Sequence, residues 1–217
     1  FNISVGGSMN DQTHFKNFQY NKGSGTDFLG FDNGLRSLNG GINATLRPMN
    51  NGYDLLNNGL NNDWSIKNRK PIADLSLSMN IAHRWVSESG RTLAMLGAVN
   101  YSNTYKTYLN MDNNLYGAYD ITHDRSNYLR KGVDDQYNHN VRVGAMLNLT
   151  YVPASGNNRY EFKNIFNQLG KDRYTYRKGT DAQSDYEESA EYYYQSRTTY
   201  SGQFTGKHTW SDTDKLD

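Results

Sequence analysis

The sequence contains no cysteine, so it has neither a disulfide framework nor thiol chemistry. It also has no run of about 20 apolar residues, which excludes membrane-spanning helices. Proline is scarce, with 3 residues, so few positions interrupt an extended strand. The chain starts at Phe1 without an initiating methionine or a basic leader, and we expect it to be a mature chain or a piece of a longer one.

Aliphatic and phenylalanine side chains are also few. Leu, Ile, Val and Phe make up about 18% of the chain, below the roughly 20% at which a water-soluble packed core becomes doubtful. The net charge is only +1, which argues against a highly charged disordered chain, and tyrosine is abundant, with 18 residues. A transmembrane β-barrel has this profile, because half of each strand faces a polar lumen. The near-neutral charge and the lack of a basic stripe argue against nucleic acid as a partner.

Period-two alternation over residues 72–108 predicts the clearest element, a β-hairpin. The odd positions are mostly apolar and the even ones mostly polar over residues 73–85, and the same pattern continues over residues 93–101. A short polar turn is predicted at residues 87–90. Each strand therefore has one apolar and one polar face.

Further alternating segments bring the expected number of long strands to about six. They lie at residues 1–9, extending towards Tyr20, and at residues 136–151, 159–167 and 192–210. A helix over residues 187–194 is the alternative for the start of the last strand, but three consecutive tyrosines favour a strand.

The predicted connections alternate between long and short. Long polar loops are expected at residues 21–70, 110–135 and 171–186, and short turns at residues 87–90, 153–158 and 211–215. Bacterial outer-membrane barrels show the same alternation, with long extracellular loops and short periplasmic turns. The strand over residues 72–85 spans roughly 45 Å, enough to cross a hydrocarbon layer of about 25 Å when tilted.

Aromatic residues lie near both ends of the apolar faces. Those near the short turns are Trp85, Tyr151, Tyr160 and Trp210, and those near the other strand ends are Tyr105, Tyr137 and Tyr192. Amphipathic rings prefer the headgroup level of a bilayer, so two such groups indicate membrane girdles. The alternative is that tyrosine and tryptophan are simply frequent in strands.

Four segments in this order resemble the barrel of TonB-dependent outer-membrane receptors, in the form common among Bacteroidetes. They are residues 30–38 (GFDNGLRSL), 145–151 (AMLNLTY), 160–167 (YEFKNIFN) and 206–208 (GKH) ahead of residues 214–217 (DKLD). The similarity runs over nearly the whole chain. It implies an all-β fold in which residues 1–217 are part of an antiparallel transmembrane β-barrel of about 22 strands, with the plug domain and the remaining strands outside this chain.

The resemblance implies a receptor and importer in the outer membrane of a bacterium. Loops facing outward would capture a scarce nutrient, such as an iron chelate, haem, cobalamin, a glycan or a peptide. Energy relayed through TonB would then move the plug domain and admit the ligand. The implied partners are outer-membrane lipid, the plug domain, TonB and this ligand, and no cofactor is implied.

Four predicted loop residues are the candidate ligand contacts: Arg36, Trp64, Tyr116 and Tyr119. Arginine and exposed aromatic side chains dominate recognition sites, which is the reason for selecting them. The alternative is that they pack loop against loop.

Motifs for catalysis and metal binding are incomplete, so we expect neither an enzyme nor a metal site. Residues 202–208 are one residue short of a phosphate-binding loop and have His208 where Ser or Thr is required. Residues 112–123 resemble a calcium-binding loop but end in His123 instead of Glu. The five histidines lack zinc-ligand spacing.

Two other classes of protein stay open. A soluble β-sandwich, acting as a ligand-binding module or a surface adhesin, also has alternating strands, but these are shorter and their apolar faces pack against each other. A hydrolase on the barrel wall would need to pair Ser102 with His139, which the alternation places on opposite faces. The surroundings of the leucines at positions 75, 77, 147 and 149 distinguish a barrel from a sandwich.

Overall fold

The computed structural model describes residues 1–37, 63–181, 183–210 and 215–216, and these residues have an all-β fold. Their strand pairs are all antiparallel, as predicted. The described ranges contain no α-helix, and their single helical element is a 3-10 turn, η1 (Asp27–Leu29).

None of the helical structure in the described ranges is long and apolar enough to cross a bilayer.

Most of the chain lies in a few very long strands. In chain order the strands are β1 (Asn2–Ser8), β2 (Phe18–Asn21), β3 (Ile66–Arg69), β4 (Asp74–Val86), β5 (Thr92–Asp112), β6 (Leu115–Asp120), β7 (Arg125–Val152), β8 (Asn158–Asp181), β9 (Tyr186–Thr209) and β10 (Lys215–Leu216). Strands β7, β8 and β9 have 28, 24 and 24 residues, whereas a typical strand has about 5 to 6.

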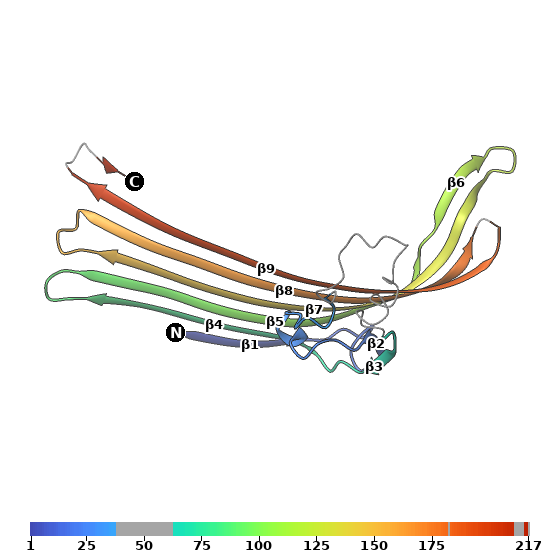
Figure 1. Ribbon diagram of the computed structural model, residues 1–217, viewed down its shortest axis with the longest axis horizontal. Helices are drawn as coiled ribbons and strands as arrows, with labels where there is room; N and C mark the ends of the chain where they lie inside the picture. The colour runs from blue at the N-terminus through green and yellow to red at the C-terminus, as the bar shows by residue number, and fades with distance from the viewer. Residues whose placement is uncertain (38–62, 182, 211–214, 217) are drawn as a thin grey trace, which may run out of the picture.

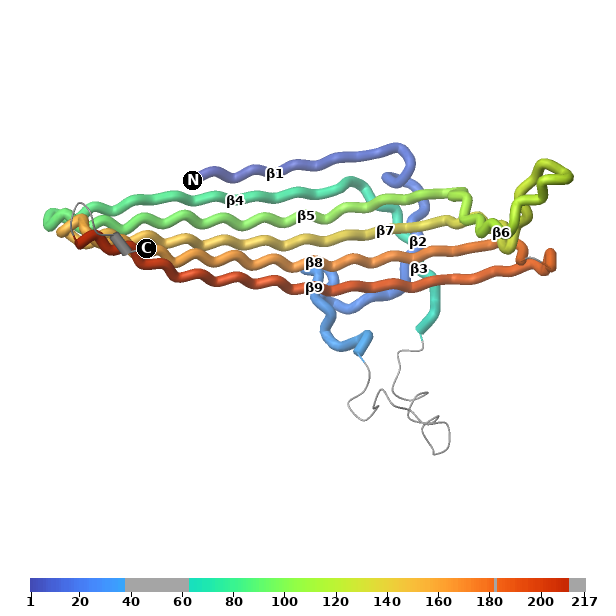
Figure 2. The backbone as a smooth tube through the Cα atoms, turned by 90° about the horizontal axis from the view of Figure 1, so that it is seen from above, coloured from blue at the N-terminus to red at the C-terminus, as the bar shows by residue number. Residues whose placement is uncertain are grey.

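The long strands form one sheet in the order β1-β4-β5-β7-β8-β9-β10, with β6 paired to the far end of β7. Figure 1 shows them as a single bowed layer, and Figure 2 shows them side by side in the same order. Strands β2 and β3 form a separate two-stranded ribbon. The described strands do not close into a barrel, and β1 lies at one edge of the open sheet.

The predicted hairpin is confirmed. Strands β4 and β5 pair in unbroken register from Leu75↔Asn103 to Val86↔Thr92. The turn between them is closed by a hydrogen bond from Ser87 N to Arg91 O of 2.9 Å, and Gly90 adopts a φ of 82° that suits glycine. The second predicted turn, between β7 and β8, is also present.

Two of the three predicted long loops are wrong, because the structure continues the strands through them. Residues 110–135 contain the end of β5, all of β6 and the start of β7, and residues 171–186 contain the end of β8 and the start of β9. Apolar residues in these parts are few and do not alternate regularly with polar ones, so the pattern that marks a half-apolar strand is lost. Backbone pairing to a strand on each side maintains β7 and β8 there. The strand preference of the tyrosines at positions 192–194 is confirmed within β9.

The amino-terminal strand is shorter than the extension towards Tyr20 predicted. It ends at Ser8, and the chain turns at Phe15, whose φ is 62°, before β2 starts on the ribbon. The predicted loop over residues 21–70 contains η1, β3 and part of β2, and its residues 38–62 lie outside the described residues. Residues 211–214 of the last predicted turn also lie outside them.

A small aromatic core forms where the ribbon packs on the sheet. Phe18 of β2 is 1% exposed and meets the rings of Tyr105 and Tyr137 edge to face, at 5.4 and 5.5 Å. Tyr174 of β8 stacks on Tyr137 at 6.1 Å. Residues 9–37 and 63–73, called here the covering segment, therefore lie against one face of the sheet.

Candidate functional site

One face of the sheet carries an apolar band. We use this name for the rows from Leu77 to Trp85 of β4 together with the residues paired to them on β5, β7, β8 and β9. Its apolar members on β4 and β5 are Leu77, Met79, Ile81, Trp85, Leu93, Met95, Val99 and Tyr101, and those on the other three strands are Val143, Ala145, Leu147, Leu149, Tyr151, Tyr160, Phe162, Phe166, Tyr200 and Phe204.

The apolar band is open over most of its area. Leu77 and Leu147 are 39% and 40% exposed, as is Leu75 just beyond the band, and Leu149 is half-buried. No second sheet in the described ranges stacks on these side chains. The enclosure between two layers that a β-sandwich requires is therefore not seen in the described part of the chain.

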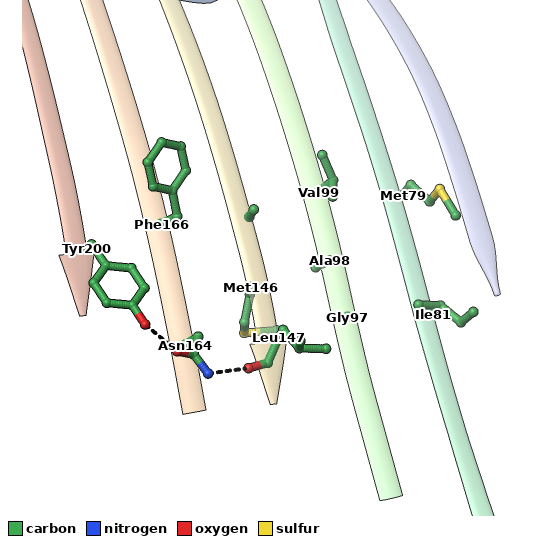
Figure 3. A pocket seen from close by; sticks show the side chains of 11 residues that line it. Met79, Ile81, Gly97, Ala98, Val99, Met146, Leu147, Asn164, Phe166 and Tyr200 are labelled. Atoms are coloured by element: carbon green, nitrogen blue, oxygen red, sulfur yellow. Dashed lines mark hydrogen bonds between the residues drawn. The ribbon is translucent and has the colours of Figure 1, made fainter. Parts of the chain in front are cut away.

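A shallow hollow of about 340 Å³ lies in the middle of the apolar band. Gly97 and Ala145 leave room at its base, and larger side chains such as Met79 and Phe166 surround it (Figure 3). Tyr200 closes one side through a hydrogen bond of 2.6 Å from its hydroxyl to Asn164 Oδ1. The hollow is thus apolar, and its few polar atoms are already bonded to each other.

Three of the four aromatic residues predicted near the short turns lie together at the end of the apolar band, and the fourth, Trp210, is exposed just past the end of β9. Trp85, Tyr151 and Tyr160 fall in one cross-strand row, and each is at least 39% exposed. The second predicted group is different. Tyr105, Tyr137 and Tyr192 do not mark strand ends, and they pack under Phe18 in the aromatic core because the covering segment lies on them.

The covering segment crosses the sheet at the edge of the apolar band, where two glycines meet. Gly30, with a φ of 80°, approaches Gly170 so closely that a Cβ on Gly170 would lie 2.5 Å from Gly30 Cα. Gly30 O accepts hydrogen bonds from Gln168 Nε2 (2.5 Å) and Ser196 Oγ (2.9 Å). Gln168 is 1% exposed, so this crossing is both tight and dry.

A polar chamber of about 250 Å³ lies between the covering segment and the sheet. Its wall on the sheet side includes His139 of β7 and Asp172 of β8, and its wall on the segment side includes Asp27 and Arg69. These residues lie one row or more beyond the apolar band, on the same face of the sheet.

Charges in and around the chamber do not all compensate each other. Arg36 binds both Asp27 and Asp32, at 2.6 and 2.8 Å, and lies 3.7 Å from the centre of the Tyr194 ring. Asp172 receives no hydrogen bond from any residue in the described ranges. Burial raises the pKa of the Asp172 carboxyl to about 6, because the nearby arginines Arg36 and Arg69 offset only part of the cost.

His139 is held neutral in the chamber wall. Its ring stacks on Tyr105 at 4.5 Å, and its Nε2 lies 2.8 Å from Asn103 Oδ1. Burial, with a smaller contribution from Arg69, lowers the pKa of His139 to about 3. The chamber therefore contains a histidine that resists protonation and a carboxyl that accepts a proton readily.

Two of the predicted ligand contacts lie in the covering segment, and both already have partners. Arg36 is fixed by the two carboxylates and the ring named above. Trp64 is 67% exposed, meets the Tyr192 ring edge to face at 5.5 Å, and accepts a hydrogen bond from the Tyr192 hydroxyl at its backbone oxygen.

The other two predicted contacts lie on the distal hairpin formed by β6 and the start of β7. Tyr116 and Tyr119 are 53% and 55% exposed. The Tyr116 ring lies against Tyr128, and the Tyr119 hydroxyl bonds to Asp124. This hairpin projects beyond the ribbon of β2 and β3 (Figure 1), so the four residues occupy two regions and do not form one site.

Neither Arg69 nor Asp172 was among the residues predicted to form a site. The residues that line the chamber come from five separated parts of the chain, and neither of these two belongs to a local motif. In the described ranges, no three side chains of His, Asp or Glu are grouped so as to hold a metal ion.

Comparisons of the chain with protein-family models, with curated proteins and with solved structures find no match.

Proposed function

We propose that this chain is a segment of an outer-membrane β-barrel receptor that imports a scarce nutrient with energy supplied through TonB. The apolar band is the observation that carries the proposal. Apolar surface left in water costs about 25 cal/mol per Å², and contact with hydrocarbon removes that cost. The opposite face of the same strands would line a hydrated lumen.

The dimensions of the apolar band support this placement. The rows from Leu77 to Trp85 extend for roughly 30 Å along a strand, and for roughly 23 Å across a bilayer at a tilt of about 40°. A barrel needs an apolar band of about 25 Å. Trp85, Tyr151 and Tyr160 would lie at the headgroup level on the side of the short turns.

The receptor role is supported by the position of the polar parts. The distal hairpin lies beyond the apolar band, and the covering segment lies at and beyond its outermost rows, where Phe31 stacks on Phe166, on the side away from the short turns. In an outer-membrane barrel that side is extracellular. Arg36 and Trp64 would act there in nutrient capture, as would Tyr116 and Tyr119, and the plug domain and TonB would supply the coupling that these strands lack.

Site-directed spin labelling tests the membrane placement directly, because the chain has no cysteine to remove. Single cysteines at Leu147, Asn148, Leu149 and Thr150 would be labelled in the full chain reconstituted into phospholipid vesicles. We expect labels at 147 and 149 to be accessible to oxygen and those at 148 and 150 to a water-soluble nickel complex. Absence of alternation would contradict the proposal, and so would a folded monomer in water without detergent, which would favour the soluble module or adhesin.

Labelling of intact bacteria tests the orientation. A cysteine at Thr122, in the distal hairpin, should react with a membrane-impermeant maleimide on intact cells. A cysteine at Ser155, in the short turn between β7 and β8, should react only after the outer membrane is permeabilised. The reverse pattern would rule out the extracellular assignment of the covering segment.

A further inference from the structure

The sheet face opposite the apolar band carries an excess of positive charge in the half of the strands that lies towards the distal hairpin. The rows from Ser102 to Tyr108 on β5, β7, β8 and β9 place five cationic side chains on this face. They place one carboxylate there, Glu191. The cations are Lys106, Arg142, Lys171, Arg173 and Arg197. The whole chain has a net charge of only +1, so this concentration is local.

Two of these cations share one cross-strand row. Arg142 of β7 pairs with Leu169 of β8, and Leu169 pairs with Arg197 of β9. Two strand spacings separate the backbones of the two arginines by roughly 10 Å. Their long side chains can therefore converge on a group placed over Leu169.

A hollow of about 470 Å³ lies at this row. Arg142 and Arg197 line it together with Asn100, Asn167 and Thr199, which offer amide and hydroxyl groups. Asn100 folds over Gly144, where an added Cβ would lie 2.0 Å from Asn100 Oδ1, so the shape of the hollow depends on that glycine.

The two arginines in the hollow differ from the other cations of this face. Arg173 binds Glu191 at 3.0 Å and lies 4.7 Å from the centre of the Tyr193 ring, and Lys171 lies against the same ring. Neither Arg142 nor Arg197 forms an ion pair or a hydrogen bond with a residue in the described ranges. Both are exposed.

We propose that Arg142 and Arg197 bind one oxyanion group, a phosphate or a carboxylate, of a small-molecule ligand in this hollow. Guanidinium groups present paired N–H donors that match two oxygens of such a group, and two arginines provide this from opposite sides. Asn100, Asn167 and Thr199 are placed to bond the remaining polar atoms. Lys106, Lys171 and Arg173 raise the local potential and attract the anion.

The site does not depend on the membrane placement. It lies on the polar face, and the same residues would form it in a soluble protein. Failure of the spin-label test would leave the anion site intact, and failure of anion binding would leave the membrane placement of the apolar band intact.

Titration of the full chain with inorganic phosphate and with citrate, followed by calorimetry at low ionic strength, tests the proposal. We expect saturable binding of at least one of them, weakened at least 10-fold in the double variant Arg142→Gln/Arg197→Gln. The matched control is Arg84→Gln/Arg91→Gln, which removes two exposed arginines near the short turn and should bind as the unmodified chain does. Preference for phosphate or for citrate identifies which oxyanion the hollow accepts.

Equal weakening in the two double variants would overturn the proposal, because it would mean attraction to net charge only. Absence of saturable binding of both anions would overturn it as well. If the double variant fails to fold, Arg142→Lys decides the matter: it retains the charge and loses the paired donors, and unchanged affinity would contradict binding by a guanidinium.

Discussion

The two halves of the long strands differ in how far the side chains on one face of the sheet are buried. Near the short turns, leucines such as Leu147 stay 40% exposed on the apolar band. Towards the distal end, on the same face of the same strands, Gln168 is 1% exposed and Tyr174 is 2% exposed, because the covering segment lies on them. Apolar side chains are thus exposed in the half near the short turns, and polar and aromatic side chains are buried in the distal half. This is expected if hydrocarbon covers one half and protein the other.

Removal of the central ring of the covered half should give the largest effect. Phe18→Ala would leave a cavity among Tyr105, Tyr137 and Tyr174, at a cost of about 3–5 kcal/mol to docking of the covering segment. Urea denaturation would be followed by Trp64 fluorescence, with the other two tryptophans replaced by phenylalanine. Phe15→Ala is the control, since Phe15 is 61% exposed, and an equal loss there would contradict a specific role for Phe18.

A charge placed on the apolar band should test the open half. Leu147 lies in the middle row of the band, so Leu147→Arg should destabilise the chain folded in vesicles by about 2–4 kcal/mol. The control is Asn148→Arg, because the next residue along β7 has its side chain on the opposite face of the sheet. It should cost less than about 1 kcal/mol. Urea titration of vesicle-bound protein measures both, and equal costs would mean that the two faces do not differ in environment.

The glycine crossing marks the border between the halves. Gly170→Ala would force Gly30 of the covering segment away from β8, at a cost of about 1–3 kcal/mol. Gly206→Ala, where the nearest atom to the new Cβ is a Tyr160 ring carbon at 3.7 Å, should be neutral or slightly stabilising. Proteolysis of the covering segment reads out the difference, and a resistant Gly170→Ala protein would show that the close approach is not required.

Protonation of Asp172 in the chamber should have the smallest effect on stability, and the direction of its pH dependence is defined. The pKa of Asp172 is raised to about 6, so the folded chain binds a proton that the unfolded chain has already lost, and stability falls as pH rises from about 4 to 6. Asp172→Asn removes that loss. It should be more stable than the unmodified chain at pH 7.5, by up to about 2 kcal/mol, and should lose this advantage below pH 4.

His139 should change stability with pH in the opposite direction to Asp172. Its pKa is lowered to about 3, so only the unfolded chain gains a proton between pH 6.5 and 3, and stability falls as pH drops through that window. His139→Gln should therefore reduce the acid sensitivity and leave the slope above pH 7 unchanged. Urea midpoints measured at pH 5 and 7.5 distinguish the two variants, and equal slopes in both would contradict the assignments.

The strands of the apolar half could be predicted from the sequence because successive side chains of a strand lie on opposite faces, so each residue reports the environment of its own face. Apolar residues alternate there with polar ones along each strand, and this predicted the positions of β4, the first part of β5 and the turn at Gly90. The face of His139 was also correct, since it pairs with Tyr105 two rows beyond the apolar band on the same face.

The distal half could not be read in this way. There the partners of each side chain come from distant segments: Asp27 and Arg69 meet Asp172 only after the covering segment has folded back over the sheet. Polar residues of β7 and β8, such as Asp134 and Arg177, form an ion pair of 2.7 Å across strands that the sequence predicted to be loops. The positive face likewise arises from four strands whose charges lie far apart in the chain, so no basic stripe was visible.

The unbroken ladder from β7 through β9 has a mechanical consequence. Pairing between these strands runs without a bulge from the short turns to the distal end, over the rows from Tyr151↔Tyr160 to Arg130↔Asp181 and from Asn158↔His208 to Thr180↔Tyr186. Sliding one strand past another would break all of these hydrogen bonds together and would move every side chain to a new neighbour. The three strands therefore act as a stiff plate, and motion in response to a ligand falls to the covering segment, which side chains and one close glycine crossing hold in place.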